Sequence, residues 1–337
     1  MSFPEIGLGA MSPEVIQAVF RYSQKHDREL MLISSKSQID YGGGYVGGFA
    51  TRGYMEFIEK MRRRYPRSRV KICRDHCGPG FNGRYDLDDC YRTIRTDIQC
   101  GFDLIHVDFC HFPGTKAEIL AQSRTAIDLC LSLNPDVELE IGTDENVGAS
   151  LNWKELDRLR LDIGYFLGFC RPRYYVVQTG SLTKETRQVG TYNREFVEAA
   201  AAMLHDSGVR LKEHNADYLS AAALNARAGH VDAMNIAPQI GVIQTSVVLN
   251  QCLAYGIDAS PYLEVCYRGG KWRKWLLKDR PEDKTLCSLI AGHYHFMSDE
   301  YRRLVDSLSK LEDIEETILL NITKVISHYA NCQEAVG

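Results

Sequence analysis

Through residues 1–255, short apolar runs alternate with longer segments whose apolar positions recur at helical spacing. The short runs predict strands, and the longer amphipathic segments predict helices. The predicted strands span residues 5–10, 29–35, 70–76, 102–108, 137–142, 174–179, 209–214 and 231–237. The first predicted helix has Ser12 as its N-cap, and the others span residues 54–64, 86–99, 115–133, 193–206, 218–228 and 239–255. After the fifth strand we expect a long connection that reaches about Gly168.

Eight strand–helix units within this length are typical of a (β/α)8 TIM barrel, which is an α/β fold. An open, doubly wound sheet is the alternative, and it fits less well because no G-x-G-x-x-G follows the first strand. We therefore expect the barrel to occupy residues 1–255. Residues 256–337 do not continue the alternation and predict helices, notably over 298–311 and 313–329. We expect these residues to form a C-terminal helical extension packed on the barrel.

Composition excludes several classes of protein. The 337 residues are 45% apolar and carry a formal net charge of −4, so no nucleic-acid groove is expected. No apolar run approaches the length of a membrane span, and no signal peptide is visible, so no membrane association is expected. The eleven cysteines show no C-x-x-C pattern and are best explained as reduced thiols, which predicts a cytoplasmic location.

Polar and ionisable side chains stand where the predicted strands end. They are Asp75, His76, Asp108, Glu140, Gln178, Glu213, His214 and Asn235. In a barrel of alternating strands and helices these ends surround one mouth, where catalytic groups lie. His76, Glu140 and His214 form a ligand set that suits Zn²⁺ or another divalent metal. Each of them could instead be a satisfied structural side chain. Other histidines are expected to be structural or to contact the metal ligands without binding the metal: His106, His111, His230, His293 and His295.

A metal site at this mouth would leave Asp75 free as a general base. A metal that polarises a carbonyl, beside a carboxylate that moves a hydroxyl proton, is the machinery of aldol cleavage through an enediolate. Glu145, in the loop after the fifth strand, could be a second acid or base, although a solvated loop charge is the simpler interpretation.

The loop after the second strand, residues 34–48, is rich in glycine and in side chains that hydrogen-bond polyols. A flexible surface loop is the alternative interpretation. We expect substrate to be bound by residues of this loop and of the strand ends, together with an acid after the seventh strand. The predicted substrate-binding residues are Gln38, Gly43, Asp108, Gln178, Asp217 and Asn235.

Several of these segments resemble the class II tagatose-1,6-bisphosphate aldolase subunit family, in its larger subunit, which is often called non-catalytic. The resembling pieces are residues 35–47, Asp75-His76-Cys77-Gly78-Pro79, His106-Val107-Asp108 and Glu213-His214-Asn215-Ala216-Asp217-Tyr218. The resemblance implies a barrel fold, a sugar or sugar phosphate as ligand, and a partner aldolase subunit or a homo-oligomer.

Catalytic class II fructose-bisphosphate aldolases are more distantly similar. Their proton-transfer Asp and a zinc-ligand His map onto Asp75 and His76, and further matches fall on Glu140 and His214. The chain departs from them at two places. Gln178 follows the sixth strand, where those enzymes have a zinc His, and Asn215-Ala216-Asp217 stands where they have a glycine-rich phosphate loop.

The sequence therefore predicts a metal-dependent enzyme that cleaves or forms a carbon–carbon bond in a ketose or ketose phosphate. Retro-aldol C4 epimerisation is a close variant, because it needs the same metal and base. The alternative is a non-catalytic barrel subunit that stabilises a partner tagatose-bisphosphate aldolase.

Overall fold

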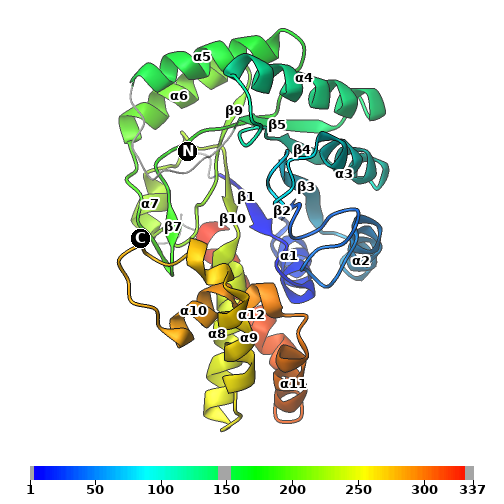
Figure 1. The fold of residues 1–337 in the computed structure, drawn as a ribbon, viewed down its shortest axis with the longest axis vertical. Coiled ribbons are helices and arrows are strands. Elements are labelled where there is room, and N and C mark those ends of the chain that lie inside the picture. Colours follow the sequence, from blue (N-terminus) through cyan, green and yellow to red (C-terminus); the bar gives the residue numbers. More distant parts are fainter. Residues whose placement is uncertain (1–3, 143–152, 331–337) are drawn as a thin grey trace.

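The computed structural model describes residues 4–142 and 153–330. Within these residues, eight parallel strands close into one barrel in the order β1-β10-β9-β6-β5-β4-β3-β2 (Figure 1). The barrel strands are β1 (Glu5–Gly9), β2 (Glu29–Ser35), β3 (Arg69–Cys77), β4 (Leu104–Val107), β5 (Glu138–Gly142), β6 (Tyr174–Val176), β9 (Arg210–Glu213) and β10 (Ala233–Ile236). The predicted TIM barrel is confirmed.

Helices surround the barrel. They are α1 (Pro13–His26), α2 (Thr51–Arg64), α3 (Leu87–Gln99), α4 (Lys116–Leu133), α5 (Trp153–Leu167), α6 (Arg194–Asp206), α7 (Ala221–Asn225) and α8 (Pro238–Ala254). The later helices are α9 (Ser260–Gly269), α10 (Lys284–Ala291), α11 (Asp299–Leu308) and α12 (Ile314–Ala330), with the 3-10 turns η1 (Lys271–Lys274) and η2 (Gly292–His295). None of the described helices combines the length and the apolar character needed to span a membrane.

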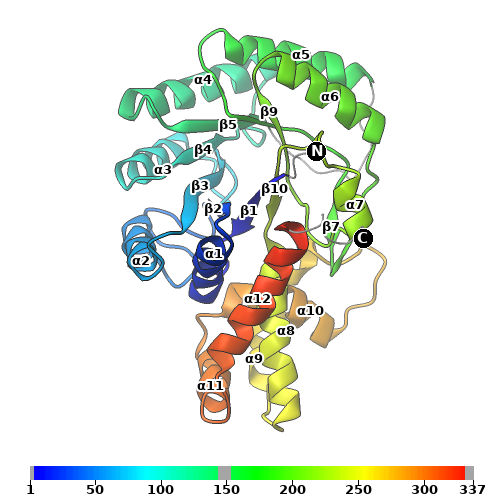
Figure 2. The same ribbon diagram turned by 180° about the vertical axis from the view of Figure 1, so that it is seen from behind.

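The C-terminal helices gather with α8 at one side of the barrel, at the bottom of both views (Figures 1 and 2). Helix α12 packs against both α1 and α8, and it therefore joins the first and the last helix of the barrel. The division between barrel and extension at residue 255 stays a prediction.

Two local predictions were wrong, and one pair of strands was not predicted. The expected long connection after the fifth strand contains α5, whose apolar positions Leu156, Leu159, Ile163 and Phe166 recur at helical spacing and are buried. The helix expected over 218–228 is the much shorter α7. An antiparallel hairpin, β7 (Thr183–Lys184) with β8 (Arg187–Gln188), follows the sixth barrel strand and was not expected.

The inside of the barrel is layered. A middle layer of buried side chains contains Met31, Ile33, Cys73, Leu104, Tyr174 and Ala233. At the N-terminal ends of the strands, Glu138 accepts hydrogen bonds from Lys71 at 2.7 Å and from Arg173 at 2.9 Å. Glu140 lies two residues further along the same strand, so it faces the interior on the other side of the apolar layer.

A fully buried ion pair fastens β3 to its surroundings. The Arg74 guanidinium donates to Asp97 of α3 from Nε at 2.6 Å and from Nη2 at 2.9 Å. Its Nη1 donates to the carbonyls of Ser34 in β2 and of Ile39 in the loop that follows β2. Because Arg74 and Asp97 are wholly inaccessible to solvent, each charge depends on the other. The pair fixes the strand that carries Asp75 and His76.

The first turn of α8 is capped by a side chain from another segment. Oδ1 of Asp217 accepts from the backbone N–H groups of Ala237 at 3.0 Å and Gln239 at 2.8 Å. A carboxylate at a helix N-terminus satisfies exposed amides and interacts favourably with the helix dipole. Burial nevertheless raises the pKa of Asp217 to about 7, against the lowering effect of these two amides.

Replacing Arg74 by Met should lower the free energy of unfolding by about 3–5 kcal/mol, because Asp97 would keep a buried, unpaired charge. Urea denaturation measures the loss. Glu59→Ala is the control, because it breaks the exposed Arg62–Glu59 pair and should cost under about 1 kcal/mol. Equal losses in the two variants would contradict the structural role of Arg74.

The raised pKa of Asp217 makes stability depend on pH. The folded protein keeps this proton up to about pH 7, whereas the unfolded chain releases it near pH 4. The protonated side chain of Asp217 therefore stabilises the folded protein fully below pH 4. As the pH rises to 7 this stabilisation is lost, which lowers the free energy of unfolding by at most about 4 kcal/mol. Asp217→Asn keeps a capping oxygen and should remove this slope, as seen by denaturation at several pH values. The exposed Asp258→Asn should leave the slope unchanged, and a slope that persists in Asp217→Asn would contradict the assignment.

Candidate metal centre

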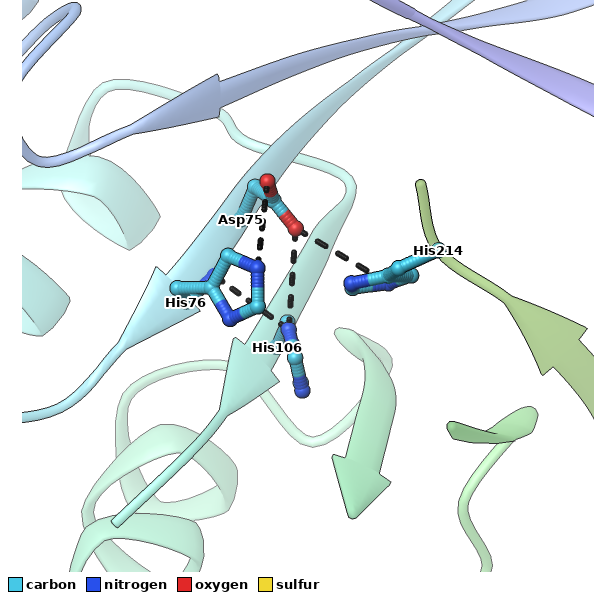
Figure 3. A group of neighbouring side chains, drawn as sticks. All are labelled: Asp75, His76, His106 and His214. Carbon is cyan, nitrogen blue, oxygen red and sulfur yellow. Dashed lines mark hydrogen bonds and ion pairs between the residues drawn. The ribbon is translucent and has the colours of Figure 1, made fainter. Parts of the chain in front are cut away.

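Two consecutive residues at the end of β3 contribute to one site. Regular alternation would place Asp75 and His76 on opposite faces of the strand. The register between β3 and β4 shifts between Arg74 and Cys77, and His76 has a φ of 46°, in the left-handed region. Such a bulge re-aims a side chain. Here it brings Asp75 and His76 to the same space (Figure 3).

Four side chains from three strand ends converge there, and we call Asp75, His76, His106 and His214 the cluster. One potential ligand atom of each lies within 4.8 Å of those of the others. Asp75 Oδ2 lies 3.8 Å from His76 Nε2, and Oδ1 lies 3.7 Å from His106 Nδ1 and 3.9 Å from His214 Nε2 (Figure 3). These separations exceed hydrogen-bond lengths. They are close to the roughly 3.4 Å between two ligand atoms of a tetrahedral zinc site.

His76 is oriented by Asp108. Its Nδ1 hydrogen-bonds Oδ2 of Asp108 at 2.9 Å, and its ring stacks on Phe81. Burial alone would lower the pKa of His76, but the Asp75 and Asp108 carboxylates raise it to about 9. A carboxylate on the far nitrogen is the usual arrangement around a metal-binding histidine, because it fixes the ring and its tautomer. Nε2 of His76 is thereby directed at the cluster.

His106 braces the site. Its Nδ1 accepts from the backbone N–H of His76 at 3.2 Å, and its Nε2 lies 2.9 Å from the carbonyl oxygen of Gly142. In the neutral form with the proton on Nε2, both ring nitrogens are therefore used by the backbone. The imidazole ties β3 to β5, in agreement with the structural role expected for it, although its position places it in the cluster.

Glu140 joins the cluster to a buried lysine. Its Oε1 accepts from His214 Nε2 at 2.8 Å and lies 3.7 Å from His106 Nδ1. Its Oε2 accepts from Lys212 Nζ at 2.5 Å. Burial alone would raise the pKa of Glu140, but Lys212 and the two imidazoles lower it to about 2. Glu140 is thus an ionised carboxylate inside the barrel.

The charge of the site suits a divalent cation. Among the described residues of the site, the carboxylates Asp75, Asp108 and Glu140 face the single ammonium of Lys212, which leaves a formal charge of −2 before any imidazole is protonated. Buried charge is costly unless it is compensated, and a divalent cation would compensate it. The imidazole nitrogens and carboxylate oxygens are also the ligands that Zn²⁺ accepts. The residues present therefore fit the predicted metal.

Two of the predicted substrate-binding residues lie at the cluster. Nδ2 of Asn235 donates to Oδ1 of Asp75 at 3.4 Å, and Asp108 contacts His76 as described. Gln178 lies to one side, where it lines a cavity of about 740 Å³ together with Asp108 and Gly142.

The other predicted residues lie elsewhere. Gln38 is buried, with Oε1 accepting from the Ser35 amide at 2.7 Å and Nε2 donating to the Met11 sulfur. Gly43 has a φ of +104° in the loop after β2. Asp217 is the cap of α8. Glu145 lies outside the described residues. A role in substrate binding stays a prediction for Gln38, Gly43 and Asp217.

Lys212 was missed from the sequence, and His106 was expected as a structural residue or as a neighbour of the metal ligands. Both could have been found from the alternation of side chains along a strand, in which every second residue points to the same face. Lys212 lies two residues before His214, and His106 lies two before Asp108, so each shares an orientation with a residue already predicted. Glu213, between Lys212 and His214, points away from the interior and pairs with Arg227 at 2.7 Å.

Comparison with known proteins gives matches of two kinds, and no family model matches the chain. Among curated proteins, the chain is 24% identical over 102 residues to D-tagatose-1,6-bisphosphate aldolase subunit GatZ of Escherichia coli (strain SMS-3-5 / SECEC). The subunit of the same name from Shigella boydii serotype 18 matches equally. Each match covers 28% of this chain and 24% of the relative, so the chain spans about a quarter of the length of the curated relatives it matches.

Solved structures match over nearly the whole chain. A probable tagatose 6 phosphate kinase from Sinorhizobium meliloti 1021 superimposes with a TM-score of 0.82 at 16% identity, covering 98% of this chain and 100% of the other. Fructose-bisphosphate aldolase from Campylobacter jejuni gives a TM-score of 0.63 at 14% identity, and the match covers 98% of this chain and 90% of the aldolase. The YdjI aldolase from Escherichia coli K12 gives a TM-score of 0.54 at 14% identity, and the match covers 92% of this chain and 94% of YdjI.

At these identities the structural matches show a shared fold. The curated matches repeatedly name one protein, the tagatose-bisphosphate aldolase subunit. The resemblance predicted from the motifs is therefore confirmed, and the chain has the barrel fold of aldolases.

Proposed function

We propose that this protein is a metal-dependent enzyme that cleaves or forms a carbon–carbon bond in a ketose or ketose phosphate, with retro-aldol C4 epimerisation as a close variant. The observation that carries the proposal is the cluster itself. An acid and three imidazoles from β3, β4 and the end of β9 meet at the carboxyl ends of the strands, with their ligand atoms within 4.8 Å of one another. This is the end of a barrel where catalytic residues lie.

His76, His214 and Glu140 would hold the metal. Nε2 of His76 faces the cluster because Asp108 holds Nδ1. Glu140 Oε1 shares a hydrogen bond of 2.8 Å with His214 Nε2, which an ion bound by both atoms would replace. When bound, Zn²⁺ or another divalent metal supplies a Lewis acid that polarises the substrate carbonyl. Glu140 would be the third ligand of this set, which lacks the sixth-strand histidine because Gln178 stands there.

Asp75 would be the base. Burial alone would raise its pKa, but His76, His106 and His214 lower it, so the carboxylate is ionised and can accept a proton. Asn235 donates to Oδ1, which fixes the carboxylate, and the gaps of 3.7–3.9 Å to His106 and His214 leave it without a short bond to either imidazole. A carboxylate held in this way can take the hydroxyl proton of a substrate bound at the same mouth.

The second candidate is a non-catalytic barrel that stabilises a partner aldolase. The observation that favours it is the curated match, which is to a protein named as an aldolase subunit. A sugar or sugar phosphate as ligand and a homo-oligomer or partner subunit as assembly are proposed on the same ground. The described cysteines are free thiols, which supports the proposed cytoplasmic location.

Metal content separates the two candidates. The purified protein should hold about one divalent ion per chain by elemental analysis, and His76→Ala and His214→Ala should each lose most of it. His230→Ala is the control, because His230 pairs with Glu198 and is no member of the cluster, so its metal content should be unchanged. A metal-free protein that co-purifies with a smaller aldolase and stabilises it would reject the enzyme in favour of the partner subunit.

Asp75→Asn should keep its metal and lose turnover by about 10²–10⁴-fold or more, because the base is removed while the imidazoles remain. Activity is measured by screening ketoses and ketose phosphates for aldehyde release or epimer formation, with bound metal assayed on the same sample. Near-normal turnover in this variant would show that Asp75 is not the base.

A further inference from the structure

Lys212 is an ammonium buried beneath the cluster. Its side chain is 1% exposed, and its Nζ lies over the ring of Tyr174, 5.2 Å from the centroid. Tyr174 belongs to the apolar layer inside the barrel. A cation at such a depth needs a bonded partner, and the described structure provides one in Oε2 of Glu140 at 2.5 Å.

The two carboxylate oxygens of Glu140 have different hydrogen-bond partners. Oε2 is bound by Lys212, while Oε1 accepts from His214 Nε2 at 2.8 Å and lies 3.7 Å from His106 Nδ1. The carboxylate is 1% exposed, so water cannot replace either contact. The orientation of Oε1 toward the imidazoles therefore depends on the bond that Lys212 makes to Oε2.

Resting on the metal centre of the proposed function, we propose that Lys212 is a positioning residue of that centre. Its ammonium holds Oε2 of Glu140 and thereby keeps Oε1 at the position where it serves as a metal ligand beside His214. Lys212 itself touches neither metal nor substrate. Groups that orient ligands in this way are worth about 10–100-fold in metal affinity.

The positive charge of Lys212 has the opposite effect on metal affinity. A positive charge beside a cation site repels the cation, so an ammonium that acted through its charge alone would weaken metal binding. Removing it would then tighten the site. If Lys212 instead positions Glu140, its removal loosens the site, because a buried carboxylate that loses the donor to one oxygen turns toward other donors. The direction of change in affinity therefore distinguishes the two roles.

The test measures the Kd for Co²⁺ by direct titration of the full-length, metal-stripped protein, with the Co²⁺ absorption bands as a report on ligand geometry. Lys212→Met should raise the Kd by about 10–100-fold and alter the bands. Lys212→Arg, which keeps a charged donor, should recover most of the affinity. An unchanged or lower Kd in Lys212→Met would overturn the proposal.

A double-mutant cycle keeps the test decisive if Lys212→Met folds poorly. If Lys212 acts through Glu140, then Lys212→Met/Glu140→Gln should bind Co²⁺ no more weakly than Glu140→Gln alone. Weaker binding by the double variant than by Glu140→Gln would show that Lys212 supports the metal independently of Glu140 and would overturn the proposal. Melting temperatures in chelator confirm that the compared variants are folded.

Failure of the proposed function gives a different result. If the unmodified protein binds neither Co²⁺ nor Zn²⁺, both the metal centre and the role of Lys212 are rejected. If the unmodified protein binds Co²⁺ and His76→Ala abolishes binding, the centre stands. In that case an unchanged Kd in Lys212→Met rejects the positioning role alone.

Discussion

Buried charge must be paired, and at the mouth of this barrel that requirement determines which side chains contact one another. Asp108 holds His76, and Lys212 holds Glu140, which in turn holds His214. Each of these bonds compensates a charge that is removed from water. Each also fixes the direction of an imidazole or carboxylate at the cluster. The same contacts therefore stabilise the fold and preorganise the site.

The strand that carries Asp75 and His76 is held on both sides by this kind of pairing. On the outer side Arg74 is bound to Asp97 and to two carbonyls of the neighbouring segment. On the inner side His106 accepts from the His76 amide. A left-handed residue within a bulge is strained and persists where its surroundings hold it. The ion pair and the imidazole brace together account for the unusual direction of His76.

The fold was predictable because several barrel strands, such as β2 and β6, are mainly apolar runs, as in other parallel sheets buried on both faces. Asp75, His76, Glu140 and His214 were predictable because topology gathers strand ends at one mouth. Lys212 was not predicted, because a lysine within a strand is ordinarily solvent-exposed, and its burial depends on a carboxylate from β5 that is distant in sequence. The capping role of Asp217 was equally invisible, because its partners are backbone amides of another segment.

Gln178 in place of a sixth-strand histidine removes one nitrogen ligand from the pattern of the catalytic class II aldolases that the motifs resemble. Glu140, at which those enzymes also match, lies on β5, which pairs directly with β6, and its carboxylate contacts His214. Lys212 bears the opposite charge and is bonded to that carboxylate. With Asp75 and Asp108 also ionised, the site keeps the negative charge that suits a divalent ion, although it has one histidine fewer than that pattern.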